Sequence, residues 1–278
     1  MPSAQAPCER HLVRLAWPQV EQAARQPGST VIWPWGAVEQ HGPHLPLGTD
    51  GLFADRVVDA VLAELPEEAP IWRLPLQAIG FSPEHQGFSG TLSLPAPLLI
   101  ELVCSVGTQL AVAGFRRLVI LNGHGGQIAL LQAAARALRV CNPALGVLPC
   151  FLWSGPEGIA ELIPEPERHR GLHAGLAETS LMLHLAPEQV GPDRPVDGFQ
   201  AQPPPPGWDL EGAVPTAWLM GDLSSSGVLG DARGASAELG TALQERLVTG
   251  WRNRLASLLV SDWPPSGCPP TGRTPQSR

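Results

Sequence analysis

Lysine is absent from this 278-residue chain, and all 18 basic residues are arginine. Schiff-base chemistry needs a lysine amine and the Walker-type phosphate loop needs a lysine beside the phosphates, so both enzyme classes are excluded. Acidic residues number 26, the formal net charge is -8, and no stretch gathers positive charge. Because nucleic-acid binding depends on clustered cations that replace phosphate counterions, we expect no nucleic-acid partner.

Cysteine is scarce as well, and no two cysteines form a C-x-x-C pair. We therefore predict neither a disulfide framework nor a zinc finger, but free thiols in a reducing compartment. Charged residues interrupt the N-terminal apolar residues, so we expect no signal peptide. The most apolar stretch, 92–115, contains polar residues and is predicted to be a buried helix instead of a membrane span. These observations predict a cytoplasmic protein without a membrane partner. The five cysteines are Cys8, Cys104, Cys141, Cys150 and Cys268.

Short apolar runs alternate with helical patterns along the chain. We predict strands at 30–36, 71–79, 116–122 and 146–153, and helices at 52–65, 97–113, 128–140, 176–185 and 235–259. This alternation predicts an α/β fold with a mainly parallel central sheet covered by helices on both faces. Prolines at 75 and 149 favour edge or terminal positions for their strands. Residues 202–207 are predicted to be a stiff surface loop. Residues 1–260 are predicted to form a single domain and residues 261–278 a disordered C-terminal tail.

The loop after the first predicted strand is rich in acids and histidines. It contains Glu39 and His41, whose spacing of two residues directs both side chains to one side of an extended segment. Asp50 precedes the next helical pattern, where a carboxylate can cap the helix or bridge two cations. An open α/β sheet places its active site beyond the carboxyl ends of its strands, so we expect a site here.

Two further segments bring ligand-type residues to the same edge. Asn122-Gly-His-Gly-Gly-Gln127 follows a predicted strand, and its glycines allow the backbone to approach whatever His124 binds. His173 precedes the predicted helix that carries Glu178 in its first turns. A cap for Asp50 and a solvated helix acid for Glu178 are the alternatives when each residue is taken alone. The whole set instead indicates two divalent ions per chain, zinc or possibly manganese or iron, which would hold a bridging hydroxide.

Other polar residues are weaker candidates. His44 lies between two prolines and is interpreted as a packing residue, and His184 as a core or surface histidine. Glu84 and His85 lie in a polar loop, for which substrate binding and a plain loop are equally good interpretations.

These motifs together resemble the creatininase family, whose members carry an E-Q-H-G segment followed by Asp, an N-G-H loop and an H-A-G-x-x-E-T-S helix start. The resemblance covers about residues 30–240. It implies a three-layer α/β/α sandwich and a homo-oligomer, often a hexamer. It also implies one metal bound by Glu39, Asp50 and His124, a second bound by His41, Asp50 and a further acid, and His173 as the catalytic histidine.

The resemblance is incomplete in the N-G-H loop. Creatininase has an acid two residues after the loop histidine and an aromatic residue directly after it, where this chain has Gly126 and Gly125. Glu178 is therefore our candidate for the further acid. Of the tryptophans that close over creatinine, only Trp153 has a suitable position. The glycine form of the loop is more similar to branches that cleave formamides or the mycofactocin precursor peptide.

We therefore predict a dinuclear-metal amidohydrolase, acting on a cyclic amide, a formamide or a small peptide, in which a metal-bridging hydroxide attacks the carbonyl and His173 protonates the leaving nitrogen. Apart from a peptidase of the mycofactocin type, carbon–nitrogen bonds other than ordinary peptide bonds are the expected targets. One rival hypothesis is a nucleotide-binding protein that cradles phosphate in the Gly123–Gly126 loop, although the acid expected about 20 residues later is missing. Another is a scaffold without catalysis.

Overall fold

The computed structural model describes residues 9–198 and 204–265. Cys8, Cys268 and most of the predicted C-terminal tail lie outside the described residues, as does the first part of the 202–207 loop. Cys104, Cys141 and Cys150 are free thiols, as predicted.

The central sheet contains four parallel strands in the order β2-β1-β3-β4. Its strands are β1 (Thr30–Trp35), β2 (Ile71–Arg73), β3 (Arg117–Asn122) and β4 (Gly146–Phe151). The predicted parallel sheet is confirmed, and the two proline-containing segments form its edges. Strand β2 is shorter than predicted because Pro75 has no N–H to donate, and beyond it only Gln77 pairs with β1.

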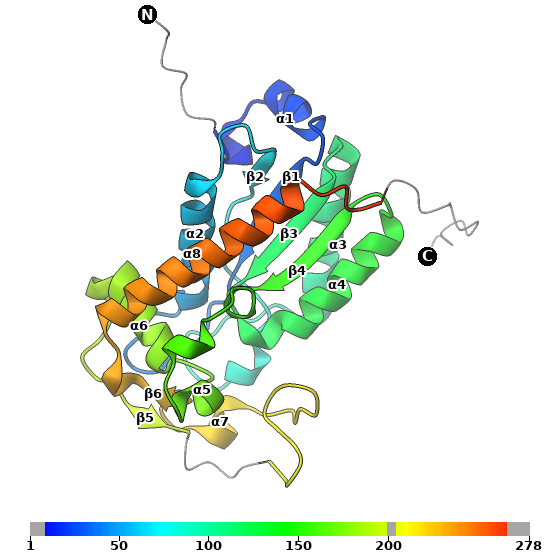
Figure 1. Cartoon of the computed structure of the whole chain (residues 1–278). Helices are drawn as coiled ribbons and strands as arrows, with labels where there is room; N and C mark the ends of the chain where they lie inside the picture. Colours follow the sequence, from blue (N-terminus) through cyan, green and yellow to red (C-terminus); the bar gives the residue numbers. More distant parts are fainter. Residues whose placement is uncertain (1–8, 199–203, 266–278) are drawn as a thin grey trace, which may run out of the picture.

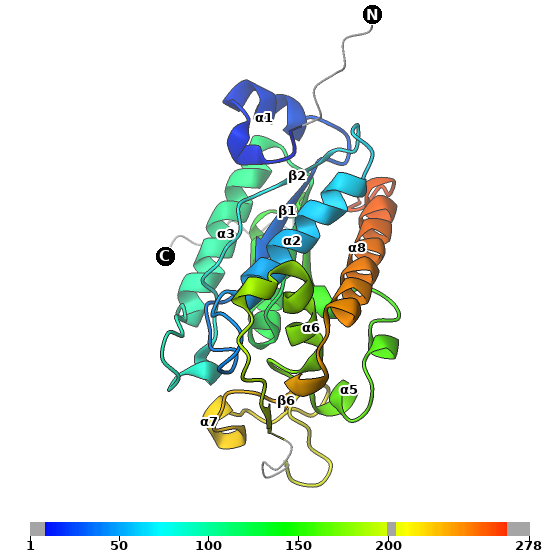
Figure 2. The same cartoon turned by 90° about the vertical axis from the view of Figure 1, so that its left-hand side faces the viewer.

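Helices cover both faces of this sheet, which confirms the α/β/α sandwich (Figure 1). One face carries α1 (Trp17–Ala24), α3 (Ala96–Ala113) and α4 (Ile128–Cys141), and the other carries α2 (Thr49–Glu64), α6 (Leu176–Leu185) and α8 (Ala237–Leu259). Figure 2 shows α3 and α8 on opposite sides of the strands. Short elements gather at the carboxyl edge: α5 (Glu167–Arg170), α7 (Met220–Leu223), and the antiparallel pair β5 (Val196–Asp197) and β6 (Gly230–Asp231).

Alternate residues of β1 point into two separate cores. Val31, Trp33 and Trp35 pack against α3 and α4, whereas Ile32 packs against α2 and α8. All six β1 residues are buried, which explains why the strand is a continuous apolar run without polar alternation.

Helix α3 differs from its prediction. Only Leu99, Val103 and Gly107 are buried, in one stripe that faces the sheet. The outer face is exposed and mixed: Leu98 is 48% and Val112 76% exposed, and the polar residues Glu101, Ser105 and Gln109 are exposed between them. This helix is long and apolar enough to cross a membrane by length and composition alone, although one such helix is weak support for a membrane span.

Two glycines at strand ends hold the start of α2 close to the sheet. A Cβ atom on Gly36, which follows β1, would lie 2.4 Å from the Cα of Gly51. A Cβ atom on Gly123, which follows β3, would lie 2.4 Å from the backbone oxygen of Asp50. The backbone of Asp50 is therefore fixed against both strand ends, and only glycine permits this approach.

We predict that Gly123→Ala destabilises the protein by about 1–3 kcal/mol, because its Cβ would overlap backbone atoms that cannot rotate away. Gly125→Ala is the matched control, since the nearest atom to its added Cβ is 3.9 Å away. Chemical denaturation of both variants measures the effect. Equal stability of the two alanine variants would show that the start of α2 is not held in this way.

Candidate metal centre

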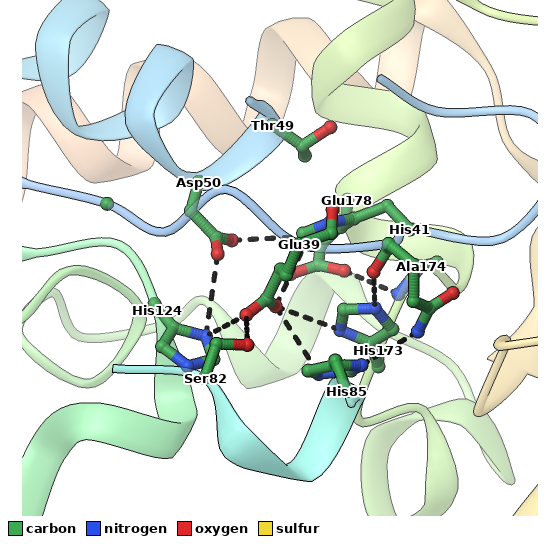
Figure 3. A network of polar contacts seen from close by, with 12 residues as sticks. Glu39, His41, Thr49, Asp50, Ser82, His85, His124, His173, Ala174 and Glu178 are labelled. Atoms are coloured by element: carbon green, nitrogen blue, oxygen red, sulfur yellow. Dashed lines mark hydrogen bonds and ion pairs between the residues drawn. The ribbon is translucent and has the colours of Figure 1, made fainter. Parts of the chain in front are cut away.

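The predicted ligand residues converge at the carboxyl edge of the sheet (Figure 3). Glu39 and His41 come from the loop after β1, and Asp50 from the first turn of α2. His124 follows β3, and Glu178 lies in the first turn of α6. These side chains are far apart in sequence and close in space because parallel strands end at the same edge.

Asp50 lies between the two histidines. Its Oδ1 atom is 3.3 Å from His41 Nε2, and its Oδ2 atom is 3.4 Å from His124 Nδ1. Glu39 lies beside the same His124 nitrogen as Asp50, with its Oε2 atom 3.1 Å from His124 Nδ1. A carboxylate with one oxygen toward each histidine has the arrangement that a residue shared by two ions needs.

Glu178 lies on the His41 side of this cluster. Ligand atoms of His41, His173 and Glu178 all lie within 4.8 Å of one another. The Ala174 N–H donates a hydrogen bond of 2.6 Å to Glu178 Oε2, and Ala174 has a positive φ of 53°. The turn before α6 therefore adopts an uncommon non-glycine conformation that holds this carboxylate at the site.

Several of these ligand atoms are buried and have no hydrogen-bond partner. They are Glu39 Oε1, His41 Nε2 and Asp50 Oδ2. A buried polar atom without a partner costs free energy, and a cation facing all three would remove that cost. The donor set of imidazoles and carboxylates suits zinc, manganese or iron, so the residues fit a metal centre.

The two simpler interpretations of the acids do not match the structure. The N-terminus of α2 has no side-chain cap hydrogen bond, so Asp50 is not a helix cap. Glu178 is only partly exposed and faces His41 instead of solvent.

The acids of the cluster strongly perturb the histidines. Although burial disfavours its charged form, the Asp50 carboxylate raises the pKa of His41 to about 10. Burial also opposes the charge on His124, but Glu39 raises its pKa well above the usual range. Burial raises the pKa of Glu178 to about 7. In the metal-free protein, the positive charge of the protonated His41 and His124 rings therefore balances the negative charge of the carboxylates.

Hydrogen bonds determine which nitrogen each histidine presents to the centre. His41 Nδ1–H donates to the Glu39 backbone oxygen at 3.2 Å, leaving Nε2 toward Asp50. His124 Nε2–H faces two acceptors at 3.1 Å, the Phe81 backbone oxygen and Glu84 Oε1, leaving Nδ1 toward the acids. Partners of this kind fix ligand tautomers in metal sites.

Glu84 also explains the glycine at position 126. A Cβ atom on Gly126 would lie 1.6 Å from Glu84 Oε1, so the Glu84 carboxylate fills the space that a side chain at 126 would need. Creatininase has its acid at that position. The acid here comes from a different loop and contacts His124 from the side away from Asp50.

Four other polar residues surround the predicted ligands. His173 Nδ1 lies 3.7 Å from Glu39 Oε1, and His85 Nε2 lies 3.4 Å from the same oxygen. Ser82 Oγ–H donates a hydrogen bond to Glu39 Oε2, and Gln40 contacts both histidines. Sequence reasoning missed Ser82 and Gln40, although Gln40 stands between two predicted ligands and Ser82 adjoins the Pro83–His85 turn.

The remaining predicted residues lie outside this cluster. Trp153 follows β4 and packs edge-on against Phe53, with ring centroids 5.7 Å apart, so its role as a substrate contact stays a prediction. His44 is buried and contacts Thr179 Oγ1 at 2.8 Å, consistent with packing. His184 contacts Thr241 at the protein surface.

Comparison with known proteins identifies the family. The profile described as creatinine amidohydrolase, that of the creatininase family, matches residues 13–255. The chain belongs to the creatininase family. Among its creatininase-family relatives is the mycofactocin precursor peptide peptidase of Mycobacterium tuberculosis, 36% identical over 82% of this chain and 84% of the relative. The creatinine amidohydrolase of Pseudomonas putida is 30% identical over 91% of this chain and 96% of the relative.

Solved creatininase structures share the fold. A manganese creatininase is 26% identical with a TM-score of 0.71, and the match covers 91% of this chain and 100% of the creatininase chain. A mutant creatininase described as the Zn-Zn type is 26% identical with a TM-score of 0.69, and the match covers 91% of this chain and 99% of the mutant chain. The protein is thus a creatininase-family hydrolase of amide bonds. Within the family it is more similar to the mycofactocin precursor peptide peptidase than to creatinine amidohydrolase.

We predict that metal binding releases protons and strengthens as the pH rises. At pH 7 His41 is protonated in the metal-free protein because its pKa is about 10, and an ion must displace this proton. Glu178 has a pKa of about 7, so its loss of a proton between pH 6 and 8 adds to the pH dependence of the metal affinity. Calorimetric titration with Zn²⁺ in buffers of different ionisation enthalpy counts the protons. Heats that do not depend on the buffer would contradict this account.

Proposed function

We propose that this protein is a dinuclear-metal amidohydrolase that cleaves a carbon–nitrogen bond in a short peptide. The observation that supports it most directly is the position of Asp50, with one carboxylate oxygen toward His41 and the other toward His124.

Each ion would draw on a different half of the cluster. Glu39 and His124 Nδ1 would hold the first, His41 Nε2 and Glu178 the second, and Asp50 both. When bound, the ions would supply Lewis acidity and an activated water for attack on the carbonyl.

His173 is placed to move protons during this reaction. It is buried, and burial, with the charges on His41 and His85, lowers its pKa well below the usual range. Its Nε2–H donates to the Gln40 backbone oxygen at 2.7 Å, so Nδ1 is the free acceptor that faces Glu39. A neutral histidine with its acceptor atom at the centre can take a proton from water and deliver it to the leaving nitrogen.

The substrate class follows from the relatives and from the site opening. The first relative described above is named a peptidase, and the loop with Gly125 and Gly126 resembles that branch of the family. Segment 204–219 reaches the site at Glu211. Its Oε1 atom is 3.9 Å from the place that a Cβ atom added to Gly125 would occupy. The same segment exposes Trp208, Val214 and Leu219. Exposed apolar side chains on a segment that reaches the site suit a peptide better than a small ring.

We propose that the protein forms a homo-oligomer, as the family resemblance implies, and the hexamer common in the family remains our expectation.

A phosphate-binding loop is less compatible with the structure. The loop around His124 faces the carboxylates of Glu39, Asp50 and Glu84, and Glu84 fills the space beside Gly126. Three acids in this position would repel a nucleotide phosphate.

We predict close to two transition-metal ions per chain after mild dialysis, with hydrolysis of peptides such as the mycofactocin precursor in preference to formamides and creatinine. Elemental analysis and a product assay with added Zn²⁺ or Mn²⁺ measure both. Asp50→Asn should abolish activity and lower the metal content, because Asp50 serves both ions. His44→Ala, the control at a buried polar residue that is not among the proposed ligands, should retain both. Equal residual activity in the two variants would count against the assignment.

We predict that Glu178→Gln loses about one ion per chain while staying folded. Glutamine preserves size but removes ligand charge, and loss of a ligand or its support commonly costs at least about 10-fold in metal affinity or activity. Glu188→Gln, on the surface beyond α6, is the control. Retention of both ions and full activity by Glu178→Gln would show that Glu178 does not complete the second site.

A further inference from the structure

Gln40 is a buried glutamine whose amide orientation is fixed by the backbone. Its Oε1 accepts a hydrogen bond of 2.9 Å from the Gly42 N–H, and its Nε2 donates one of 3.0 Å to the Gly227 backbone oxygen. A reversed amide would place two acceptors together at Gly227 and two donors together at Gly42. Nε2 is therefore the atom that faces His85, and its second hydrogen is available to that ring.

This orientation fixes the tautomer of His85. Gln40 Nε2 donates to His85 Nδ1 at 2.8 Å, so Nδ1 is the acceptor and the ring proton lies on Nε2. His85 Nε2, which carries this proton, lies 3.4 Å from Glu39 Oε1 at the centre of the site, and the two atoms form no hydrogen bond (Figure 3).

The same residue sets the opposite tautomer in His173. His173 Nε2–H donates to the Gln40 backbone oxygen at 2.7 Å, which leaves Nδ1 without a proton toward Glu39. The His85 and His173 rings lie side by side, with centroids 4.3 Å apart and planes inclined by 36°. One ring thus presents a donor and the other an acceptor to the same carboxylate oxygen.

The surrounding glycines are required by this arrangement. A Cβ atom on Gly227 would lie 1.8 Å from Gln40 Oε1, and both Gly227 and Gly42 have positive φ angles, 80° and 65°. The chain therefore keeps two left-handed glycines around one buried amide. These backbone contacts leave the amide a single orientation, with Nε2 toward His85.

We propose that His85 is a second catalytic histidine, whose Nε2–H donates a hydrogen bond to the carbonyl oxygen of the scissile amide, and that Gln40 is the positioning residue that fixes this donor. The inference rests on the proposed amide hydrolysis. As the bond from the water oxygen to the carbonyl carbon forms, the C=O electron pair moves to the carbonyl oxygen, and His85 stabilises its charge. The C–N bond then breaks, and the proton lost by water passes through His173 Nδ1 to the leaving nitrogen. His85 gives up no proton.

A metal-ligand role for His85 makes a different prediction. Ligand atoms of Glu39, His85 and His173 lie within 4.8 Å of one another, so an ion could approach. With its proton on Nε2, however, His85 has no lone pair toward the centre. Removing His85 should therefore lower turnover and leave the metal content unchanged.

The test uses the full-length, zinc-loaded protein and three measurements: metal content, steady-state kinetics and ¹⁵N NMR of the histidine rings. His85→Phe should retain both ions and lose about 100-fold in kcat, the loss typical of removing one oxyanion donor. Its missing NMR signals assign His85, which we expect in the Nε2–H form in the unmodified protein. Gln40→Glu, which cannot donate to Nδ1, should shift His85 to the Nδ1–H form and lower kcat at least about 10-fold, with KM changed little. His44→Phe is the control for loss of a buried histidine.

Three results would overturn the proposal: an Nδ1–H tautomer of His85 in the unmodified protein, loss of an ion in His85→Phe, or unchanged kcat in that variant. Failure of the proposed function is a separate result. It would appear as an unmodified protein that binds no metal and hydrolyses no amide, and it would remove the role of His85 as well.

Discussion

The structure depends on the electrostatic balance of three acids, the buried Glu39 and Asp50 and the partly exposed Glu178. Carboxylates placed together in a buried site are stable only beside compensating positive charge. In the metal-free protein that charge comes from protons on His41 and His124, whose pKa values are both raised. Divalent ions would replace these protons at the same nitrogen atoms. The fold therefore holds a site in which protons and metal ions would compete for the same nitrogen atoms.

The backbone makes this balance possible by bringing separate loops to one sheet edge. The ends of β1 and β3 lie side by side because these strands pair along their full length, from Thr30 with Arg117 to Trp35 with Asn122. Gly36 and Gly123 then allow the start of α2 to approach both strand ends. Stability of the sheet and geometry of the metal centre are thus set by the same contacts.

The sequence alone was sufficient for the parallel sheet, its helical layers and the five converging ligand candidates. Residues in loops directly after predicted strands can be placed from the sequence, because all strands of a parallel sheet end at the same edge. The roles of Glu84 and Gln40 could not be predicted, since they depend on which side chain fills the space left by a distant glycine. Gly126 indicated only a missing acid, whereas the structure places the Glu84 carboxylate in that space. Similarly, the apolar pattern of α3 does not distinguish a buried helix from one that buries a single stripe and leaves Leu98 and Val112 exposed.

The central claim is that Asp50 is shared by two ions, and locating those ions tests it most directly. Crystals of the zinc-loaded protein, measured on both sides of the zinc absorption edge, give anomalous difference peaks at metal positions. We predict two peaks about 3.5–4 Å apart, one beside His124 Nδ1 and one beside His41 Nε2, with the Asp50 carboxylate between them. A single peak, or two peaks of which only one contacts Asp50, would contradict the account.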